Sequence, residues 1–402
     1  MVYSEHVDQE LANRVYEHII HLADEIGPRG SCTQGEVQAA QYVASVFHSL
    51  GLDSVQTQDI WGAPTAYGRY AVAIGIALLS QVLAGWMQSG WSYIIAGVIS
   101  GLCAWAMYAE SDFRPNWTHW LIRSHRSQNI LAHCPARKTP EHQVVITAHI
   151  DTHRTPFFNS NATWQRLYNR SFRLIFISLV ISAGLTLLKG VTNLVSLEAL
   201  SIAVRLPPFL GLLAFLQADR TPFSPGAYDN ASGVACALGI AELLAQKPLE
   251  NTAIWVAATG CEETGAGGMF ALVNSRAESW RQALWINLDQ TGIGQLYLRL
   301  EEGMLRRYAI QPSALQLARQ SSEASGIPMR ERHSQAFSDA IIANQRGLLS
   351  ISLGASPTDQ GLETPRHQLS DVPAAIQPET LYQTIDYVWG MLSLWDQQER
   401  GM

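Results

Sequence analysis

The chain has 402 residues, of which 47% are hydrophobic and only 15% are charged, and its formal net charge is −7. The charged fraction lies below the value of about 25% that is usual for soluble proteins, which indicates segments that are buried or face a membrane. The negative net charge excludes the basic surface that is typical of nucleic-acid binding, so we expect no nucleic-acid partner. Five scattered cysteines without a Cys-x-x-Cys spacing indicate reduced core thiols rather than a disulfide framework.

The N-terminal part of the chain has the pattern of a soluble α/β domain. Apolar residues recur at helical spacing over residues 8–26 and again over roughly 34–50. Residues 55–60 alternate as in a strand. The polar residues 1–6 predict that no cleavable signal peptide is present. We therefore expect residues 1–68 to form the first part of a soluble domain.

Two regions interrupt this pattern with apolar runs of membrane-spanning length. Residues 70–89 and 91–108 contain no charged residue, and about 20 apolar residues suffice to cross the core of a bilayer. The second region, 172–216, is also apolar but contains Pro207-Pro208, so its last helix would span as a broken helix or lie partly at the interface. The alternative is a set of buried helices in a large soluble core. Trp and Tyr near the ends of the runs favour the membrane.

We expect two transmembrane hairpins, at residues 69–110 and 172–218, because each insertion must return the chain to the same side of the bilayer. The protein would then be a multi-pass protein of the cell membrane with about four helices and the lipid bilayer as a partner. Arginines cluster on the domain side of the hairpins, whereas the opposite turns offer only Lys189. The positive-inside rule therefore predicts that the soluble domain faces the cytoplasm.

Beyond residue 127 the sequence alternates strands with helices. Strands are expected at 127–132, 144–149, 252–258, 283–289 and 348–353, and helices from about 234, at 267–281, at 314–325 and at 378–396. This alternation predicts an α/β fold with a mostly parallel central sheet covered by helices on both faces. The soluble domain would be completed by residues 111–171 and 219–402.

Residue types that bind metal ions follow several of the expected strands. His149 and Asp151 lie two residues apart after one strand, so both side chains point to the same side of an extended chain. The remaining candidates follow in chain order: Asp229 in a turn of small residues, Glu262 and Glu263 after a strand, Asp289 at a strand end, and His367 in a late loop. Each residue alone is more often a cap or a solvated loop residue. Because open α/β sheets place their sites at the carboxyl ends of strands, the set predicts one shared site.

The motifs resemble those of the co-catalytic two-zinc aminopeptidases, zinc exopeptidases whose relatives include glutamate carboxypeptidase and the glutaminyl cyclases. The resemblance rests on His149-Ile150-Asp151, the segment from Gly226 to Gly233, Glu262-Glu263-Thr264-Gly265, Asn287-Leu288-Asp289 and His367. It covers essentially the whole soluble part of the chain. It implies a three-layer fold like that of the zinc exopeptidases, into which the apolar hairpins are inserted.

The resemblance also implies a cofactor, Zn²⁺, with two ions per chain. Asp229 would bridge the two ions. His149 and Asp289 would complete the ligand shell of one ion, and Glu263 and His367 that of the other. Two such ions polarise a carbonyl and lower the pKa of a water molecule.

Two further carboxylates would act beside the ions, Glu262 as the general base and Asp151 as the residue that orients His149. The implied activity is that of a membrane-bound metallo-aminopeptidase, a zinc hydrolase that removes N-terminal residues from a peptide substrate. Two alternatives stay open, namely a glutaminyl-cyclase-like amide-processing enzyme and a non-catalytic membrane receptor or scaffold. Retention of every ligand type favours hydrolysis. The motifs specify neither the preferred N-terminal residue nor the oligomeric state.

The chain departs from the family pattern in two features, the apolar insertions and the last motif. Arg366 precedes His367 where the family usually has His-Thr-Pro, so the pocket next to this ligand would be altered. His153 is expected to make a local hydrogen bond rather than to join the site. Asp339 is a candidate supporting residue.

Overall fold

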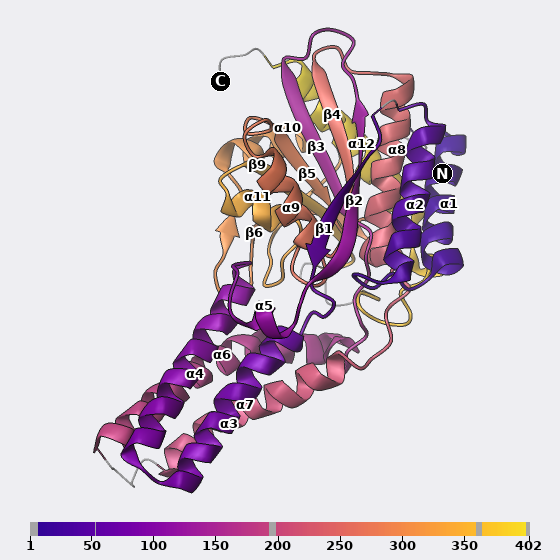
Figure 1. Ribbon diagram of the computed structural model, residues 1–402. Helices are drawn as coiled ribbons and strands as arrows, with labels where there is room; N and C mark the ends of the chain where they lie inside the picture. Colours follow the sequence, from indigo (N-terminus) through magenta and orange to yellow (C-terminus); the bar gives the residue numbers. More distant parts are fainter. Residues whose placement is uncertain (1–6, 53, 193–197, 359–363, 399–402) are drawn as a thin grey trace.

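Figure 1 shows the computed structural model of the chain, in which a bundle of long helices projects from an α/β domain. The structure describes residues 7–52, 54–192, 198–358 and 364–398. The N-terminal residues 1–6, for which no signal peptide is expected, lie outside these ranges.

A nine-stranded sheet forms the centre of the α/β domain. Its strands are β1 Gln56–Gly62, β2 His125–Cys134, β3 His142–His149, β4 Thr252–Thr259, β5 Leu284–Leu288, β6 Gln295–Glu302, β7 Tyr308–Ala309, β8 Arg330–His333 and β9 Leu349–Ser356. Their order is β1-β2-β4-β3-β5-β9-β6-β7, with β8 paired to β6. The central strands β4, β3, β5 and β9 are parallel, as predicted. The flanking pairs β1–β2, β2–β4 and β6–β9 are antiparallel, so the sheet as a whole is mixed.

The sequence did not predict β6, β7 or β8. In β6 the four consecutive residues Leu296 to Arg299 are all buried, although the sequence itself alternates, with leucine at positions 296, 298 and 300. Arg299 and Glu302 point into the domain, where they approach each other to 3.7 Å. The alternating leucines are a strand signal that the sequence analysis overlooked, and the charged residues between them do not match the continuous apolar run of a core strand.

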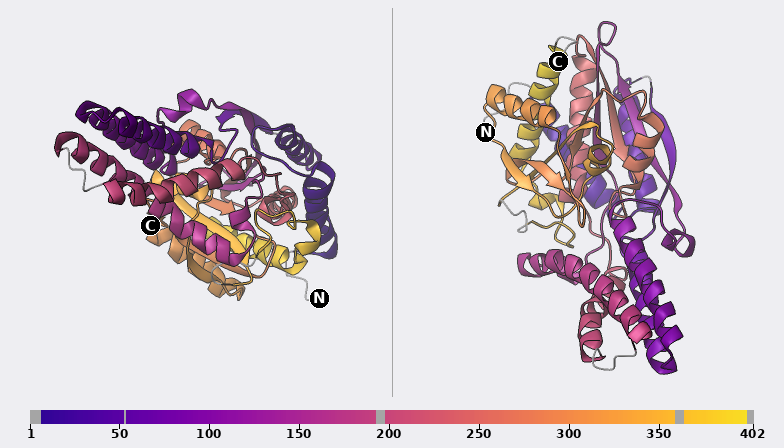
Figure 2. Two further views of the ribbon diagram at one scale, coloured as in Figure 1. Left: turned by 90° about the horizontal axis from the view of Figure 1, so that it is seen from below. Right: turned by 90° about the vertical axis from the view of Figure 1, so that its left-hand side faces the viewer.

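Helices cover both faces of the sheet (Figure 2). One face carries α1 Gln9–Ile20 with its π-helical extension His21–Ile26, α2 Gln34–Ser49, α8 Ser232–Gln246, α10 Pro312–Ser325 and α12 Pro378–Asp396, and the other carries α9 Gly267–Arg276 and α11 Ala340–Gln345. Neighbouring residues of β3 point to opposite faces of the sheet. Ile146 packs in the same core cluster as Leu238 of α8, and Val145 packs in the cluster that contains Leu272 of α9. The predicted three layers are therefore present.

The projecting bundle contains α3 Gly68–Met87, α4 Gly90–Ser111, α6 Ala162–Thr192 and α7 Glu198–Ala218. The described part of the chain thus has four helices that are long and apolar enough to cross a membrane. α6 begins at Ala162, well before the expected hairpin start at residue 172. α7 continues through Pro207 and Pro208 and packs against α3 and α6. Neighbouring helices help apolar helices to tolerate proline.

A polar contact inside the bundle ties three of its helices together. The side-chain amide of Gln81 in α3 donates to Oγ of Ser100 in α4 at 2.8 Å. It also accepts a hydrogen bond from Oγ of Ser182 in α6 at 2.7 Å. All three side chains are buried. Because unpaired polar groups are costly in an apolar surrounding, these bonds fix how the helices pack.

Candidate metal centre

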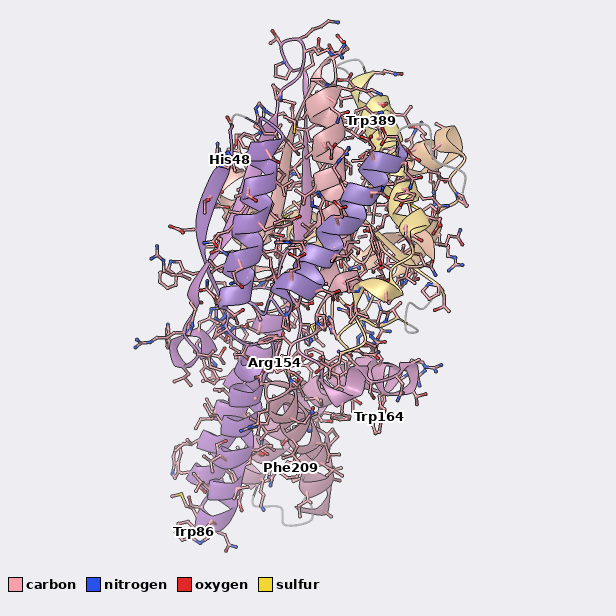
Figure 3. The ribbon with its side chains drawn as sticks, turned by 90° about the vertical axis from the view of Figure 1, so that its right-hand side faces the viewer. His48, Trp86, Arg154, Trp164, Phe209 and Trp389 are labelled. Carbon is pink, nitrogen blue, oxygen red and sulfur yellow. The ribbon has the colours of Figure 1, made fainter. Side chains whose placement is uncertain are left out.

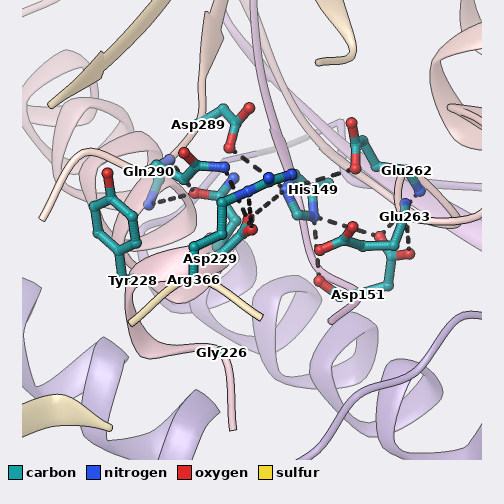
Figure 4. A network of polar contacts seen from close by, with 12 residues as sticks. His149, Asp151, Gly226, Tyr228, Asp229, Glu262, Glu263, Asp289, Gln290 and Arg366 are labelled. Carbon is teal, nitrogen blue, oxygen red and sulfur yellow. Dashed lines mark hydrogen bonds and ion pairs between the residues drawn. The ribbon is translucent and has the colours of Figure 1, made fainter. Parts of the chain in front are cut away.

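Four of the predicted ligands and bases lie at the carboxyl ends of neighbouring parallel strands (Figure 4). His149 ends β3, Asp289 follows β5, and Glu262 and Glu263 follow β4. β3 pairs in parallel with both β4 and β5, so these ends lie at the same edge of the sheet. The topology therefore brings together residues that are more than 100 positions apart in the sequence.

Asp229 reaches the same place from the turn η4 (Ala227–Ala231) that precedes α8, in which Asp229 and Asn230 have non-helical backbone angles. The side chain of Asn230, which follows Asp229 through a cis peptide bond, binds three backbone groups of α8 and the end of β5 at 2.9–3.1 Å. Asp371 accepts hydrogen bonds from the backbone N–H groups of the turn, including that of Asp229 at 3.2 Å. Gly226 has a φ of +69°, and a Cβ there would lie 2.2 Å from a neighbouring side chain, so this position requires glycine.

His367 completes the set from the loop after β9, and the ligand atoms form two groups. Nε2 of His149 lies 3.3 Å from Oδ1 of Asp229 and 3.7 Å from Oδ1 of Asp289. Nε2 of His367 lies 3.1 Å from Oδ2 of Asp229 and 3.3 Å from Oε1 of Glu263. Two ligand atoms that are each about 2.0 Å from a tetrahedral zinc ion lie about 3.3 Å apart. Asp229 offers one carboxylate oxygen to each group.

Three of these ligand atoms are buried and, although they lie close to other ligand atoms, make no hydrogen bond of good geometry within the described part of the chain. They are Oε1 of Glu263, Oδ1 of Asp289 and Nε2 of His367. A buried polar atom without a partner is costly, so three of them in one cluster indicate that the site binds a further group. Imidazole and carboxylate are ligand types that zinc accepts. The residues present therefore fit divalent zinc.

The charges of the centre shift the pKa values of its members. Burial raises the pKa values of Glu262 and Glu263 well above their ordinary range. Burial alone would lower the pKa of His149, but the surrounding carboxylates, Glu262 foremost, raise it well above its ordinary value. Bound cations favour deprotonated ligands, so we expect metal binding here to release protons.

Asp151 lies behind the ligands and holds the loop that follows β4. Its carboxylate accepts hydrogen bonds from the backbone N–H groups of Glu262 at 3.0 Å and Glu263 at 3.1 Å, and from the hydroxyl of Ser31 at 2.6 Å. Nδ1 of His149 lies 3.1 Å from the backbone oxygen of Asp151 and 3.5 Å from its Oδ1. This position suits the orienting role that the resemblance implies.

Two residues that the sequence did not single out also contact the ligands. Arg299 in β6 lies 2.8 Å from Oδ2 of Asp289, which leaves the other carboxylate oxygen for an ion. Nδ2 of Asn159 lies 2.9 Å from Nδ1 of His367, and with the amide turned over its oxygen would accept the Nδ1–H of an imidazole that binds an ion through Nε2. No motif marks either residue, because one belongs to the unpredicted strand and the other to the short helix η2 (Phe157–Asn159) before α6.

The two remaining sequence candidates lie beside the centre. Nδ1 of His153 binds the backbone oxygen of the next residue at 2.6 Å, which is the local hydrogen bond that we expected, but His153 also forms a potential metal-binding group with Glu263 and His367, so it is not separate from the site. Its ring also stacks on His367, with the centroids 3.9 Å apart. Asp339 accepts a hydrogen bond from Thr259 at the end of β4. Asp339 thus supports the strand end rather than a ligand.

A cavity of about 110 Å³ opens beside Glu262 and Glu263, and helices of the bundle form part of its wall. Its aromatic lining residues are Tyr67, Tyr70, Phe113, Tyr168, Phe172 and Phe337. Tyr70 belongs to α3, and Tyr168 and Phe172 belong to α6. The inserted helices therefore contribute directly to the space in front of the centre. Arg366 also lines this cavity, and its Nε lies 3.1 Å from Oδ2 of Asp229.

The sequence is similar to known metallopeptidases over part of its length. The sequence model of Peptidase family M28 matches residues 218–392. Aminopeptidase YwaD of Bacillus subtilis (strain 168) is 29% identical over 178 residues, which cover 42% of this chain and 38% of that protein. The match thus spans well under half of the curated relative.

The fold is similar to solved structures over nearly the whole chain. BSAP, a zinc aminopeptidase from Bacillus subtilis, superimposes with a TM-score of 0.57 at 17% identity, covering 97% of this chain and 96% of BSAP. A glutaminyl cyclase from Bacteroides thetaiotaomicron superimposes with a TM-score of 0.58 at 13% identity, covering 99% and 100%. At these identities the likeness shows a shared fold, which confirms the predicted α/β class.

Proposed function

We propose that the chain is a membrane-embedded zinc aminopeptidase, because the sequence model of Peptidase family M28 matches residues 218–392. The observation that supports this proposal most strongly is the position of Asp229, whose two carboxylate oxygens face two separate histidines. His149 and Asp289 would hold one zinc ion, and Glu263 and His367 the other, with Asp229 shared between them. When bound, the ions would polarise the peptide carbonyl and lower the pKa of a water molecule.

Glu262 is the group that we assign to proton transfer. Its Oε2 lies 4.0 Å from Nε2 of His149, so it borders the ligand cluster, and it lines the cavity in which a substrate would lie. Glu262 would take a proton from water as the water oxygen attacks the peptide carbonyl. It would then pass this proton to the departing amine as the C–N bond breaks. The products are the freed first amino acid and a shortened peptide.

The presence of every expected ligand together with Glu262 favours hydrolysis over the two alternatives, a glutaminyl-cyclase-like activity and a non-catalytic receptor or scaffold. A receptor or scaffold would have no need for three buried ligand atoms without partners. The likeness to a glutaminyl cyclase concerns the fold alone.

The aromatic cavity predicts a preference for a large apolar first residue. Among chromogenic amino-acid amides, we expect phenylalanine or leucine to have a kcat/KM at least about tenfold above that of glycine, because the aromatic lining buries an apolar side chain. Phe172→Trp should partly fill the cavity and shift the preference toward smaller residues. Phe209→Trp, on the exposed surface of the bundle, is the matched control. Equal rates across the amide panel would contradict this role of the cavity.

Tryptophans at both ends of the bundle support a transmembrane position. Trp86 at the far end is 83% exposed, and Trp120 near the α/β domain is 81% exposed. Figure 3 shows Trp86 at the tip of the bundle, Trp164 next to the α/β domain and Phe209 between them. Tryptophan favours the two bilayer interfaces, and the bundle surface between these residues exposes apolar side chains such as Leu83 and Leu213.

We therefore expect the protein to stay in the membrane fraction after alkaline carbonate extraction and to leave it only in detergent. Its release by carbonate would contradict the transmembrane assignment. The arginines near the α/β domain, with Lys189 at the opposite end of the bundle, support a cytoplasmic position of that domain. Protease should then digest it in inverted membrane vesicles and leave it intact in sealed right-side-out vesicles.

A further inference from the structure

A second cavity, of about 320 Å³, lies beside the metal centre and has a cationic lining. Its basic lining residues are Arg166, Arg170, Arg299, Arg332, His333 and Arg366. Among the described residues that line it there is no Asp or Glu. Both cavities are lined by Gln165, Asn169 and Arg366, so they adjoin at the centre.

The arginines of this cavity have different surroundings. Arg299 and Arg366 lie against the ligand carboxylates, at 2.8 Å from Asp289 and 3.1 Å from Asp229. Arg166 and Arg170 come from the first turns of α6 and are exposed. The positive charges of Arg299 and Arg366 are already balanced by the ligand carboxylates. The arginines of α6 therefore add the further positive charge that faces this cavity.

The charge of this cavity determines how a peptide would lie across the centre. The protonated amino terminus of a substrate would be repelled by several arginines, which excludes it from this cavity. The aromatic cavity shares Arg366 with it but is also lined by the carboxylates of Glu110, Glu262 and Glu263, so it would accept the first residue. The residue after the cleaved bond must then enter the cavity lined by arginines.

We propose that the arginine-lined cavity binds a substrate carboxylate on the leaving side of the cleaved bond. This carboxylate would be the side chain of an acidic second residue or the C-terminus of a dipeptide. Arginine suits this task because its planar guanidinium can form two parallel hydrogen bonds to one carboxylate. The inference rests on the proposed function, since it assigns the two sides of the same cleavage.

Three substrates with the same first residue distinguish a side-chain carboxylate from a C-terminal carboxylate. Phe-Gln-amide carries none, Phe-Glu-amide carries one on the side chain, and Phe-Gln with a free C-terminus carries one at the chain end. We expect kcat/KM for at least one of the two acidic substrates to exceed that of Phe-Gln-amide by about tenfold or more. The better of the two identifies the source.

Variants of α6 test whether the arginines cause this preference. The double variant Arg166→Gln/Arg170→Gln should bring the kcat/KM ratio of acidic to neutral substrate toward one. Arg170→Glu should favour Phe-Lys-amide over Phe-Glu-amide, which loss of structure alone would not produce. Arg126→Gln is the matched control, because Arg126 is an exposed arginine of β2 outside both cavities, and its ratio should stay that of the wild type.

Equal kcat/KM for all three substrates would overturn this inference and leave the aminopeptidase proposal standing. Hydrolysis of none would overturn the aminopeptidase proposal instead. Calorimetric binding of the same peptides would then decide the inference, and equal affinities would refute it. The same variants should also be assayed with and without phosphatidylglycerol vesicles. If the substitutions altered only the effect of the vesicles on the rate and left the ratio of acidic to neutral substrate unchanged, the cavity would bind a lipid phosphate and the inference would be wrong.

Discussion

Replacing Glu262 with glutamine is expected to lower kcat by about 10²–10⁴-fold while the bound zinc is retained. Glutamine has almost the same shape as glutamate but cannot accept a proton at neutral pH. The ligands that we assign are other residues, so the ions should stay in place. Steady-state kinetics and metal analysis of the same purified sample measure both effects.

The matched control for this variant is Glu250→Gln. Glu250 pairs with Arg137 at the surface and lies outside both cavities, so we expect wild-type turnover. A Glu262→Gln enzyme as active as the wild type would remove Glu262 from the mechanism. A variant that lost its zinc would instead make Glu262 a ligand.

Replacing Asp229 with alanine is expected to remove both metal ions and to reduce hydrolysis to background. His149 and His367 each approach a different oxygen of this one carboxylate, so its loss takes a ligand from both groups. The variant also leaves Arg366 without its partner at 3.1 Å. Metal content per chain and amide hydrolysis, measured together, test this expectation.

Asp24→Ala is the control, because Asp24 is an exposed residue of the N-terminal helical segment. It should keep the metal content and activity of the wild type. If the Asp229→Ala protein still bound two ions per chain, Asp229 would not bridge them, and the assignment of the ligands would be wrong.

The central part of the fold and the candidate centre could be read from the sequence for one physical reason. Buried parallel strands such as β3 are continuous apolar runs, and polar residues directly after such runs stand out. His149, Asp289 and Glu263 each follow a run of this kind. The parallel pairing of the strands then places them together without any further information.

The edges of the site were not predicted, because their residues lie outside the motifs that mark the ligands. Arg299 pairs with Asp289 from β6, whose alternating leucines indicate a strand but do not indicate that Arg299 reaches a ligand. Tyr168 and Phe172 have the spacing of an ordinary apolar helix, so nothing in the sequence showed that they line the cavity. Arg366 was recognised as a departure from the family motif, but its contact with Asp229 depends on the folded loop.

Zinc content per chain in detergent-purified protein, measured together with the chelator-sensitive hydrolysis of phenylalanine amide, tests the central claim most directly. The account predicts about two zinc ions per chain, loss of hydrolysis on chelation and its recovery when zinc is returned. A folded chain that binds no metal and hydrolyses no amide would contradict the account and favour a membrane receptor or scaffold.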